Sequence, residues 1–210
     1  MITAITEKSN INTNQVPFIG DDEALLVALK ANQAGSKEVL YERYAGHVRG
    51  VIVKTLGTNV DLQDHLHNVF IEAFQSIGGL RDGKKLKSWL TSVTIYTVIA
   101  YIRKKKRKKW LIFLPSDELP EQVVETDNGE NSRVLKQVYE VLDEMSANDR
   151  IAFSLRIIDG MTLMDAAQAC NVSLATIKRR LNKAKQRFNV LAKKYPLLVE
   201  FMNSNGFGRN

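Results

Sequence analysis

Apolar residues recur at helical spacing along almost the whole chain, and no segment alternates between apolar and polar residues as a half-buried strand would. The pattern indicates helices that begin near Asp21 or Asp22, after Ser36, after Asn59 or Asp61, and near Leu86. Two more are expected over about 133–145 and after Ser146. The periodicity therefore predicts an all-α fold, and a hydrophobic share of 44% is enough to build a core.

Charge is distributed in blocks along the 210 residues. Residues 21–113 carry 16 basic and 9 acidic side chains, residues 114–132 carry 6 acidic and no basic ones, and residues 151–210 carry 10 basic and 3 acidic ones. The acidic segment also holds two of the four prolines, which is typical of an exposed linker. Two basic blocks around an acidic spacer favour a polyanion-binding protein with two contact sites.

These composition shifts predict two small helical domains joined by an acidic linker. We expect a flexible tail over 1–20, a first domain over 21–113, the linker over 114–132, a second domain over 133–202 and a frayed tail over 203–210. The longest apolar stretch, Val93 to Ile102, has ten residues, whereas a helix needs about 20 to span a bilayer. The N-terminus has no apolar core of signal-peptide length, and Cys170 is the single cysteine. We therefore expect a soluble cytoplasmic protein that contacts no membrane.

The segment 161–188, MTLMDAAQACNVSLATIKRRLNKAKQRF, has the pattern of a helix-turn-helix. Thr162 can cap a short first helix, whose small alanines allow a second helix to cross closely. Asn171 lies where the turn needs a positive φ, and Ser173 can cap the second helix. That helix has an apolar stripe, from Leu174 through Ile177 onward, opposite a face rich in hydrogen-bond donors, which suits the major groove of DNA. An ordinary basic surface helix would show the same face, but without the small-residue helix and the turn.

Seven basic residues follow one another without a break from Arg103 to Lys109. Such a block can be a solvated helix end, a membrane-surface anchor, a localisation tag or a nucleic-acid contact. A membrane anchor would have an apolar face beside the charge. Here the charges surround the helix, as sequence-neutral contact with phosphates permits, although cations at a helix C-terminus also stabilise the helix itself.

Several segments resemble the extracytoplasmic-function sigma factors, a family of bacterial RNA polymerase initiation subunits. The segment LDEMSANDRIAFSLRIIDGMTLMDAAQACNVSLATIKRRLNKAKQRF is similar to the promoter-binding C-terminal region of that family. DDEALLVALKANQAGSKEVLYERY and DLQDHLHNVFIEAF resemble its polymerase-binding helices. LKSWLTSVTIYTVIAYIRKKKRK resembles the helix that ends its −10-binding domain. The likeness covers roughly 21–110 and 133–192 in the order of the family.

The resemblance implies two DNA-binding surfaces. Family positions that meet the −35 promoter element are occupied by Ser173, Thr176, Lys178, Arg179, Asn182 and Lys183. The loop 78–87 corresponds to the family element that holds an unpaired base of the −10 strand, and the basic block corresponds to the end of the adjoining helix. The −10 surface would comprise Arg81, Lys84, Lys85, Lys87, Trp89, Arg103, Lys104, Lys105, Lys106 and Arg107. For Trp89, stacking on DNA and packing in the core are both open.

The resemblance also implies a surface for core RNA polymerase on the helix over 61–77. Its expected contacts are Asp61, Asp64, His67, Asn68 and Glu72. The chain departs from the family here, because the family commonly has a Gln-Glu pair in place of His67-Asn68 and an apolar residue in place of His65. The acidic linker resembles a family segment that enters the RNA path of the polymerase, and a plain solvated tether is the alternative. An anti-sigma factor is a further partner that the family admits.

No catalytic motif accompanies these features. The chain has no phosphate-binding glycine loop and no nucleophile elbow, and His65 and His67 lie on different sides of their helix, which suits a metal poorly. We therefore predict a sigma factor that is not an enzyme and needs no cofactor or metal. The alternative is a stand-alone helix-turn-helix regulator, or a sigma-like protein that binds a partner without initiating transcription. A stand-alone regulator should dimerise, and the sequence shows no heptad seam for this.

Overall fold

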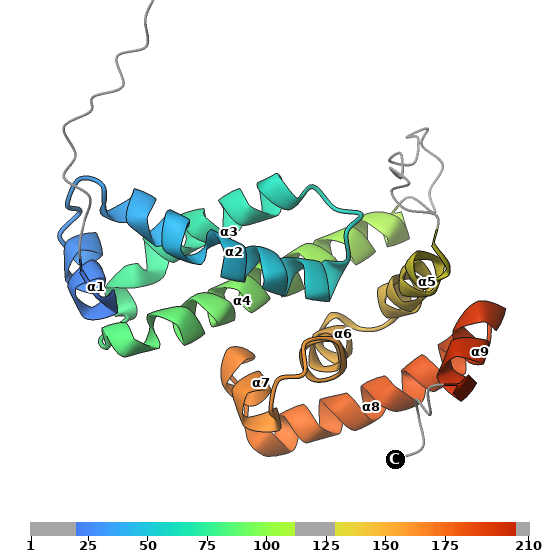
Figure 1. Ribbon diagram of the computed structural model, residues 1–210. Coiled ribbons are helices and arrows are strands. Elements are labelled where there is room, and N and C mark those ends of the chain that lie inside the picture. The colour runs from blue at the N-terminus through green and yellow to red at the C-terminus, as the bar shows by residue number, and fades with distance from the viewer. Residues whose placement is uncertain (1–19, 112–128, 205–210) are drawn as a thin grey trace, which may run out of the picture.

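The computed structural model describes residues 20–111 and 129–204, and every regular element in these ranges is helical (Figure 1). The prediction of an all-α fold is therefore confirmed for this part of the chain. Nearly all of the predicted N-terminal tail, most of the acidic linker and most of the predicted C-terminal tail lie outside the described residues. In the two described ranges, no helix combines the length and the apolarity that crossing a membrane requires.

The N-terminal half consists of α1 (Asp22–Lys30), α2 (Ser36–Leu56), α3 (Leu62–Ser76) and α4 (Leu86–Leu111), with two 3-10 turns, Ile77–Gly79 and Gly83–Lys85, before α4. Asp21 and Asp61 cap α1 and α3, because each carboxylate accepts a hydrogen bond from the backbone N–H three residues later, at 3.0 Å. Ser36 was expected just before α2 but is its first residue. Its hydroxyl donates to the Gln33 carbonyl instead, at 2.7 Å.

The C-terminal half consists of α5 (Glu130–Glu144), α6 (Ala147–Phe153), a π-helical turn (Ser154–Ile158), α7 (Leu163–Ala169), α8 (Leu174–Ala192) and α9 (Pro196–Ser204). Ser146, Thr162 and Ser173 each cap the helix that follows them. Asn171 has φ 49°, so the α7–α8 turn has the conformation that the sequence predicted. The helix-turn-helix is thus present.

The two halves pack against each other rather than standing apart. In Figure 1, α6 lies between α4 and α8, and α7 also packs against α4. A single hydrophobic cluster joins residues of α2, α3 and α4 to Ile151, Ala152 and Leu155, and all three are almost fully buried. A second cluster lies inside the C-terminal half, where the rings of Phe153 and Phe188 stack with centroids 4.5 Å apart. The core therefore continues across the predicted boundary between the domains.

Candidate nucleic-acid interface

The helix α8 separates an apolar side from a polar side. Ile177, Leu181 and the later members of its apolar stripe are buried against the rest of the C-terminal half, whereas Lys178, Arg179 and Asn182 are exposed. Leu174, the first residue of the predicted stripe, is 40% exposed, and the stripe is buried from Ile177 onward. The exposed side therefore presents donors that no apolar packing covers.

Three predicted contacts on α8 have partners within the protein. The Ser173 and Thr176 hydroxyl oxygens lie 2.9 Å apart, and the Ser173 oxygen also accepts from the Thr176 backbone N–H at 3.2 Å. The Lys183 Nζ lies 3.6 Å from the carboxylate of Asp149, a buried residue of α6. The cap fixes the start of α8, and Asp149 orients Lys183, while Arg179 stays open to solvent.

The predicted loop 78–87 is more ordered than its glycines indicate. Leu80 is buried between the two 3-10 turns, and Asp82 caps the second turn by accepting from the Lys84 N–H at 3.0 Å. The side chains of Arg81, Lys84, Lys85 and Lys87 are exposed. Trp89, at the start of α4, is half-buried and packs against the core. The loop thus presents four exposed cations, while the burial of Leu80 and the cap at Asp82 hold its backbone in place.

The basic block at the end of α4 contacts the C-terminal half. The Arg103 guanidinium donates to the Asn148 side-chain oxygen at 3.4 Å, and the Lys105 Nζ lies 3.7 Å from the Asp143 carboxylate. The ammonium group of Lys106 donates to the Met145 carbonyl. In the part of the chain that the structure describes, Lys104 and Arg107 are exposed and make no ion pair. Only part of the block therefore faces solvent without a protein partner.

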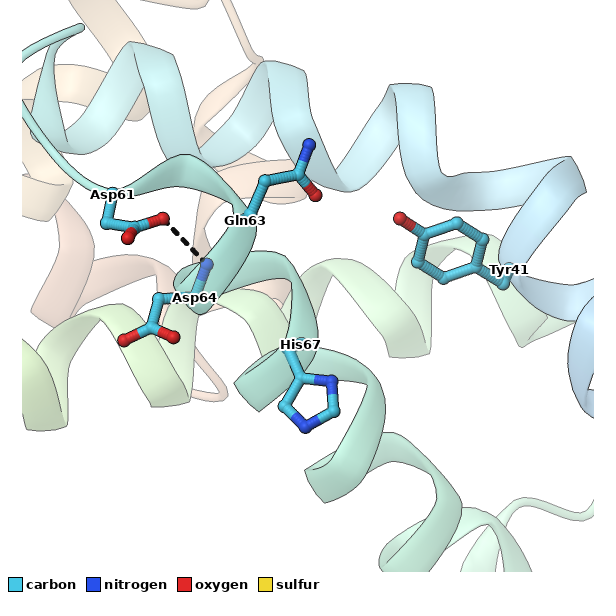
Figure 2. A pocket seen from close by; sticks show the side chains of 5 residues that line it. All are labelled: Tyr41, Asp61, Gln63, Asp64 and His67. Atoms are coloured by element: carbon cyan, nitrogen blue, oxygen red, sulfur yellow. Dashed lines mark hydrogen bonds between the residues drawn. The ribbon is translucent and has the colours of Figure 1, made fainter. Parts of the chain in front are cut away.

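Predicted polymerase contacts line a surface hollow between α2 and α3. Figure 2 shows Asp61, Gln63, Asp64 and His67 around the start of α3, with Tyr41 of α2 across from them. Three of the five predicted residues thus lie together. Asn68 is exposed and Glu72 is half-buried further along α3, and neither lines the hollow.

His65 points away from this hollow, which explains why a histidine can stand at a position that is commonly apolar. Its ring packs edge-on against the Tyr101 ring of α4, with centroids 4.4 Å apart. Burial lowers the pKa of His65, so the ring is neutral at pH 7. His67, two residues later, is exposed. The two histidines therefore take different surroundings, as their spacing predicted.

Arg150 and Tyr139 join the two halves, and sequence reasoning missed both. Arg150 of α6 is 2% exposed, and it donates to the carbonyls of Thr55 at 2.9 Å and Leu56 at 3.2 Å while pairing with Asp143. The Tyr139 hydroxyl donates to the Val53 carbonyl at 3.0 Å. The last carbonyls of a helix have no partner within it, so Arg150 satisfies those of Thr55 and Leu56 at the end of α2. Tyr139 adds a second bond to the Val53 carbonyl, which already accepts from the Gly57 N–H.

Two exposed aromatic rings on α4 were also missed. Tyr96 is 65% exposed and Trp110 is 78% exposed. Each lies seven residues from Arg103, so the three side chains fall near one face of the helix. That spacing was a usable signal, because aromatic rings beside cations are typical of surfaces that bind single strands.

Cys170 carries the single thiol of the chain. Burial raises the pKa of the Cys170 thiol to about 11, which leaves it protonated at pH 7. Among the described residues, no three His, Cys, Asp or Glu side chains gather closely enough to hold a metal ion. The surfaces described above offer cations, hydrogen-bond donors and exposed aromatic rings.

Comparison with known families gives two matches, in the order expected. The family described as Sigma-70 region 2 matches residues 40–108, and the family described as Sigma-70, region 4 matches residues 135–188. The ECF RNA polymerase sigma-E factor of Haemophilus influenzae is 21% identical over 179 residues, which cover 79% of this chain and 92% of the relative. The RNA polymerase sigma-H factor of Pseudomonas aeruginosa is 19% identical over 193 residues, which cover 85% and 96%.

Two solved structures share the fold. CnrH, in complex with the cytosolic domain of CnrY, has a TM-score of 0.52 and 15% identity, and the match covers 83% of this chain and 98% of that one. The sigma factor RpoE, in complex with the anti-sigma factor NepR from Bartonella quintana, has a TM-score of 0.51 and 19% identity, with 76% and 98% covered. At these identities the likeness concerns the fold alone.

Proposed function

Because the chain belongs to the extracytoplasmic-function group of the sigma-70 family, we propose that it binds core RNA polymerase in the bacterial cytoplasm and directs it to promoters with −10 and −35 elements. One observation carries the proposal: two family regions occur in order, and each presents an exposed basic surface. The polymerase would perform the chemistry, and this subunit would supply binding and position.

The exposed side of α8 supports a role at the −35 element. An arginine can bond two acceptors of a guanine edge at once, and Arg179 is exposed for such a contact. Lys178, Asn182 and Lys183 would extend the contact along the groove. Ser173 and Thr176, at the start of α8, would lie near phosphates, where a helix N-terminus favours negative charge.

The loop 78–87 and α4 support a role at the −10 element. The exposed cations Arg81, Lys84, Lys85 and Lys87 would approach the phosphates of a separated strand, and Lys104 and Arg107 would continue the contact. An unpaired base that stacks on an aromatic ring, such as that of Trp89, gains roughly 1–3 kcal/mol of binding free energy. Binding to exposed bases in preference to paired ones would therefore drive strand separation.

The hollow of Asp61, Asp64 and His67 supports the polymerase contact. Two carboxylates at its edge would suit a basic surface of the polymerase, and complementary charge of this kind raises association rates and fixes register. Asn68 and Glu72 would extend the contact along α3. A partner of the anti-sigma class belongs to the same proposal, since RpoE was solved in complex with one.

Copurification with core RNA polymerase tests the proposal directly. The tagged chain should retain core polymerase, and the resulting holoenzyme should start transcripts at promoters that core polymerase alone ignores. The double variant Asp64→Ala/His67→Ala should retain less polymerase than the wild type. Gln75→Ala, an exposed change elsewhere on α3, is the matched control and should bind normally.

Two results would overturn the proposal. One is a chain that retains no polymerase. The other is a chain that binds promoter DNA as a dimer without polymerase, which would establish a stand-alone regulator.

A further inference from the structure

The first turn of α1 lies directly against the loop 78–87, although sixty residues separate them in the chain (Figure 1). The Glu23 carboxylate accepts a hydrogen bond from the Gly83 backbone N–H at 3.0 Å. Gly83 is buried, and a buried N–H without an acceptor is costly. Glu23 therefore ties the backbone of the loop to α1.

Gly83 must be glycine because the two backbones approach so closely. A Cβ atom at this position would stand 2.5 Å from both the Asp22 carbonyl oxygen and the Glu23 Cα. Real Cβ atoms essentially never approach backbone atoms to that distance. The loop and α1 are thus in contact at backbone level, and no side chain separates them.

α1 is itself held in place at this point. The Asp22 carboxylate accepts from the Arg43 guanidinium at 2.7 Å and from the Tyr44 hydroxyl, and Arg43 also donates to the Gly20 carbonyl at 2.8 Å. Burial and the bond to Asp22 both raise the pKa of Tyr44, so its hydroxyl stays a donor. Since α2 fixes Asp22, the backbone of the neighbouring Glu23 is held in place, and its exposed side chain reaches the loop from there.

The loop carries its cations on either side of the anchored glycine. Arg81 lies two residues before Gly83, and Lys84 follows it directly; both side chains are exposed. Leu80 and Leu86 are buried at the two ends of this segment. The Glu23 bond therefore fixes the middle of the segment, between its two apolar anchors, where the cations project.

We propose that Glu23 is a positioning residue for base capture at the −10 strand. By holding the Gly83 N–H, it fixes the place at which Arg81 and Lys84 meet an unpaired base and its phosphates. The inference rests on the proposed function of the loop and adds α1 to that site. Contacts that discriminate between bases need side chains held to within about 0.5 Å, so a loop released from α1 should still bind the strand but select its bases less well.

The test uses full-length protein in holoenzyme with core polymerase. The DNA is a promoter whose −10 region is unpaired, with its bases changed one at a time. Glu23→Ala should reduce discrimination at one −10 position by roughly two- to tenfold, the range that corresponds to the net contribution of one typical intramolecular hydrogen bond. Discrimination at the −35 element should not change. Glu23→Gln should behave as the wild type, because its amide oxygen can accept the same bond.

Glu38→Ala is the matched control, because Glu38 is exposed in the first turn of α2. It should leave discrimination at every position unchanged. If Glu23→Ala does not fold, Glu23→Asp replaces it, because the shorter side chain keeps the charge but does not reach the Gly83 N–H.

Wild-type discrimination at every −10 position in the Glu23 variant would overturn the inference, even if its melting temperature fell. A wild-type holoenzyme that itself shows no −10 preference would overturn the proposed function of the loop as well. The two failures are distinct, because the first appears only in the variant.

Discussion

The two basic surfaces differ in what their cations contact. On α8, Lys178 and Arg179 point into solvent, and Lys183 pairs with Asp149. At the end of α4, by contrast, Arg103, Lys105 and Lys106 all contact the segment between the end of α5 and the start of α6. The surface on α8 is therefore mostly available to a ligand, whereas the one on α4 also holds the two halves together.

This difference shows that the number of basic residues in a segment overstates the positive charge that is available to a ligand. A lysine beside a carboxylate of its own protein is already partly neutralised, so it gains less from a phosphate than a lysine with no such neighbour. The sequence contains seven consecutive basic residues, but the fold gives them unequal surroundings.

The largest effect is expected at Arg150, on which the contact between the halves depends. Arg150→Ala would remove the donor from the carbonyls of Thr55 and Leu56 and the partner of Asp143. Arg150 is buried but Asp143 is exposed, so the loss should come mainly from the two buried carbonyls left without a donor, each at about 1–3 kcal/mol of unfolding free energy. Urea unfolding should show this loss, and Arg187→Ala, an exposed change on α8, should show almost none. Equal stability of the two variants would mean that the contact between the halves contributes little.

The next effect concerns Arg179, an exposed cation on the α8 surface. Arg179→Ala should weaken holoenzyme binding to the promoter by about 1–3 kcal/mol and relax the preference at one −35 base pair. Competition binding with promoters mutated one pair at a time measures both quantities. Arg133→Ala, an exposed arginine on α5, serves as the control. An equal loss on every sequence would make Arg179 a phosphate contact only.

Features that depend on a few consecutive residues could be predicted from the sequence. The caps at Asp21, Asp61, Thr162 and Ser173 and the positive φ of Asn171 are examples. Each depends on backbone groups within one helical turn, so the residue type carries the information. The helical period likewise predicted the buried sides of the helices, apart from Leu174 at the end of its stripe.

Contacts between distant segments could not be predicted in this way. Arg150 bonds to carbonyls 94 and 95 residues away, and Glu23 bonds to a backbone N–H 60 residues away. Backbone groups carry no residue identity, so the sequence does not show which distant side chain bonds to them. For the same reason the charge pattern placed a linker between two domains but did not indicate that Ile151 would join the core of the first. The residue-level DNA and polymerase contacts stay predictions.

A smaller effect should separate two neighbouring lysines of the block. Lys104→Ala should reduce the slope of log affinity against log salt by about 0.7, the value for one lost phosphate contact on a single strand. Lys105→Ala should reduce it less, because Asp143 lies 3.7 Å from its ammonium group. Titration of holoenzyme with promoter DNA at several salt concentrations measures both slopes. Equal reductions in the two variants would mean that Lys105 leaves Asp143 when promoter DNA binds. The cations on α4 would then be as available to DNA in the complex as those on α8.

The smallest effect reports on the charge of Lys87, which belongs to the −10 surface. His47 is half-buried between α2 and α4, with Nε2 2.8 Å from the Thr91 hydroxyl oxygen. Burial lowers the pKa of His47, the Lys87 ammonium lowers it further, and Lys54 adds to this while Asp159 opposes it. Lys87→Met should therefore raise the pKa of His47, and Lys84→Met should leave it unchanged.

The sign of the pH dependence follows from which state binds the proton first. As the pH falls through the ordinary histidine pKa of 6.5, His47 in the unfolded chain becomes protonated while the folded protein keeps it neutral. The unfolding free energy should therefore fall with pH from 6.5 down to the lowered pKa, and less steeply in Lys87→Met. Burial also lowers the pKa of His65, so His65 adds a decline of the same sign to the unfolding free energy. The comparison should therefore be made with His65→Gln present in both the reference protein and the Lys87→Met variant. NMR titration of the His47 ring gives the pKa itself, and an unchanged value in Lys87→Met would show that the charge of Lys87 is already screened where it is expected to meet DNA.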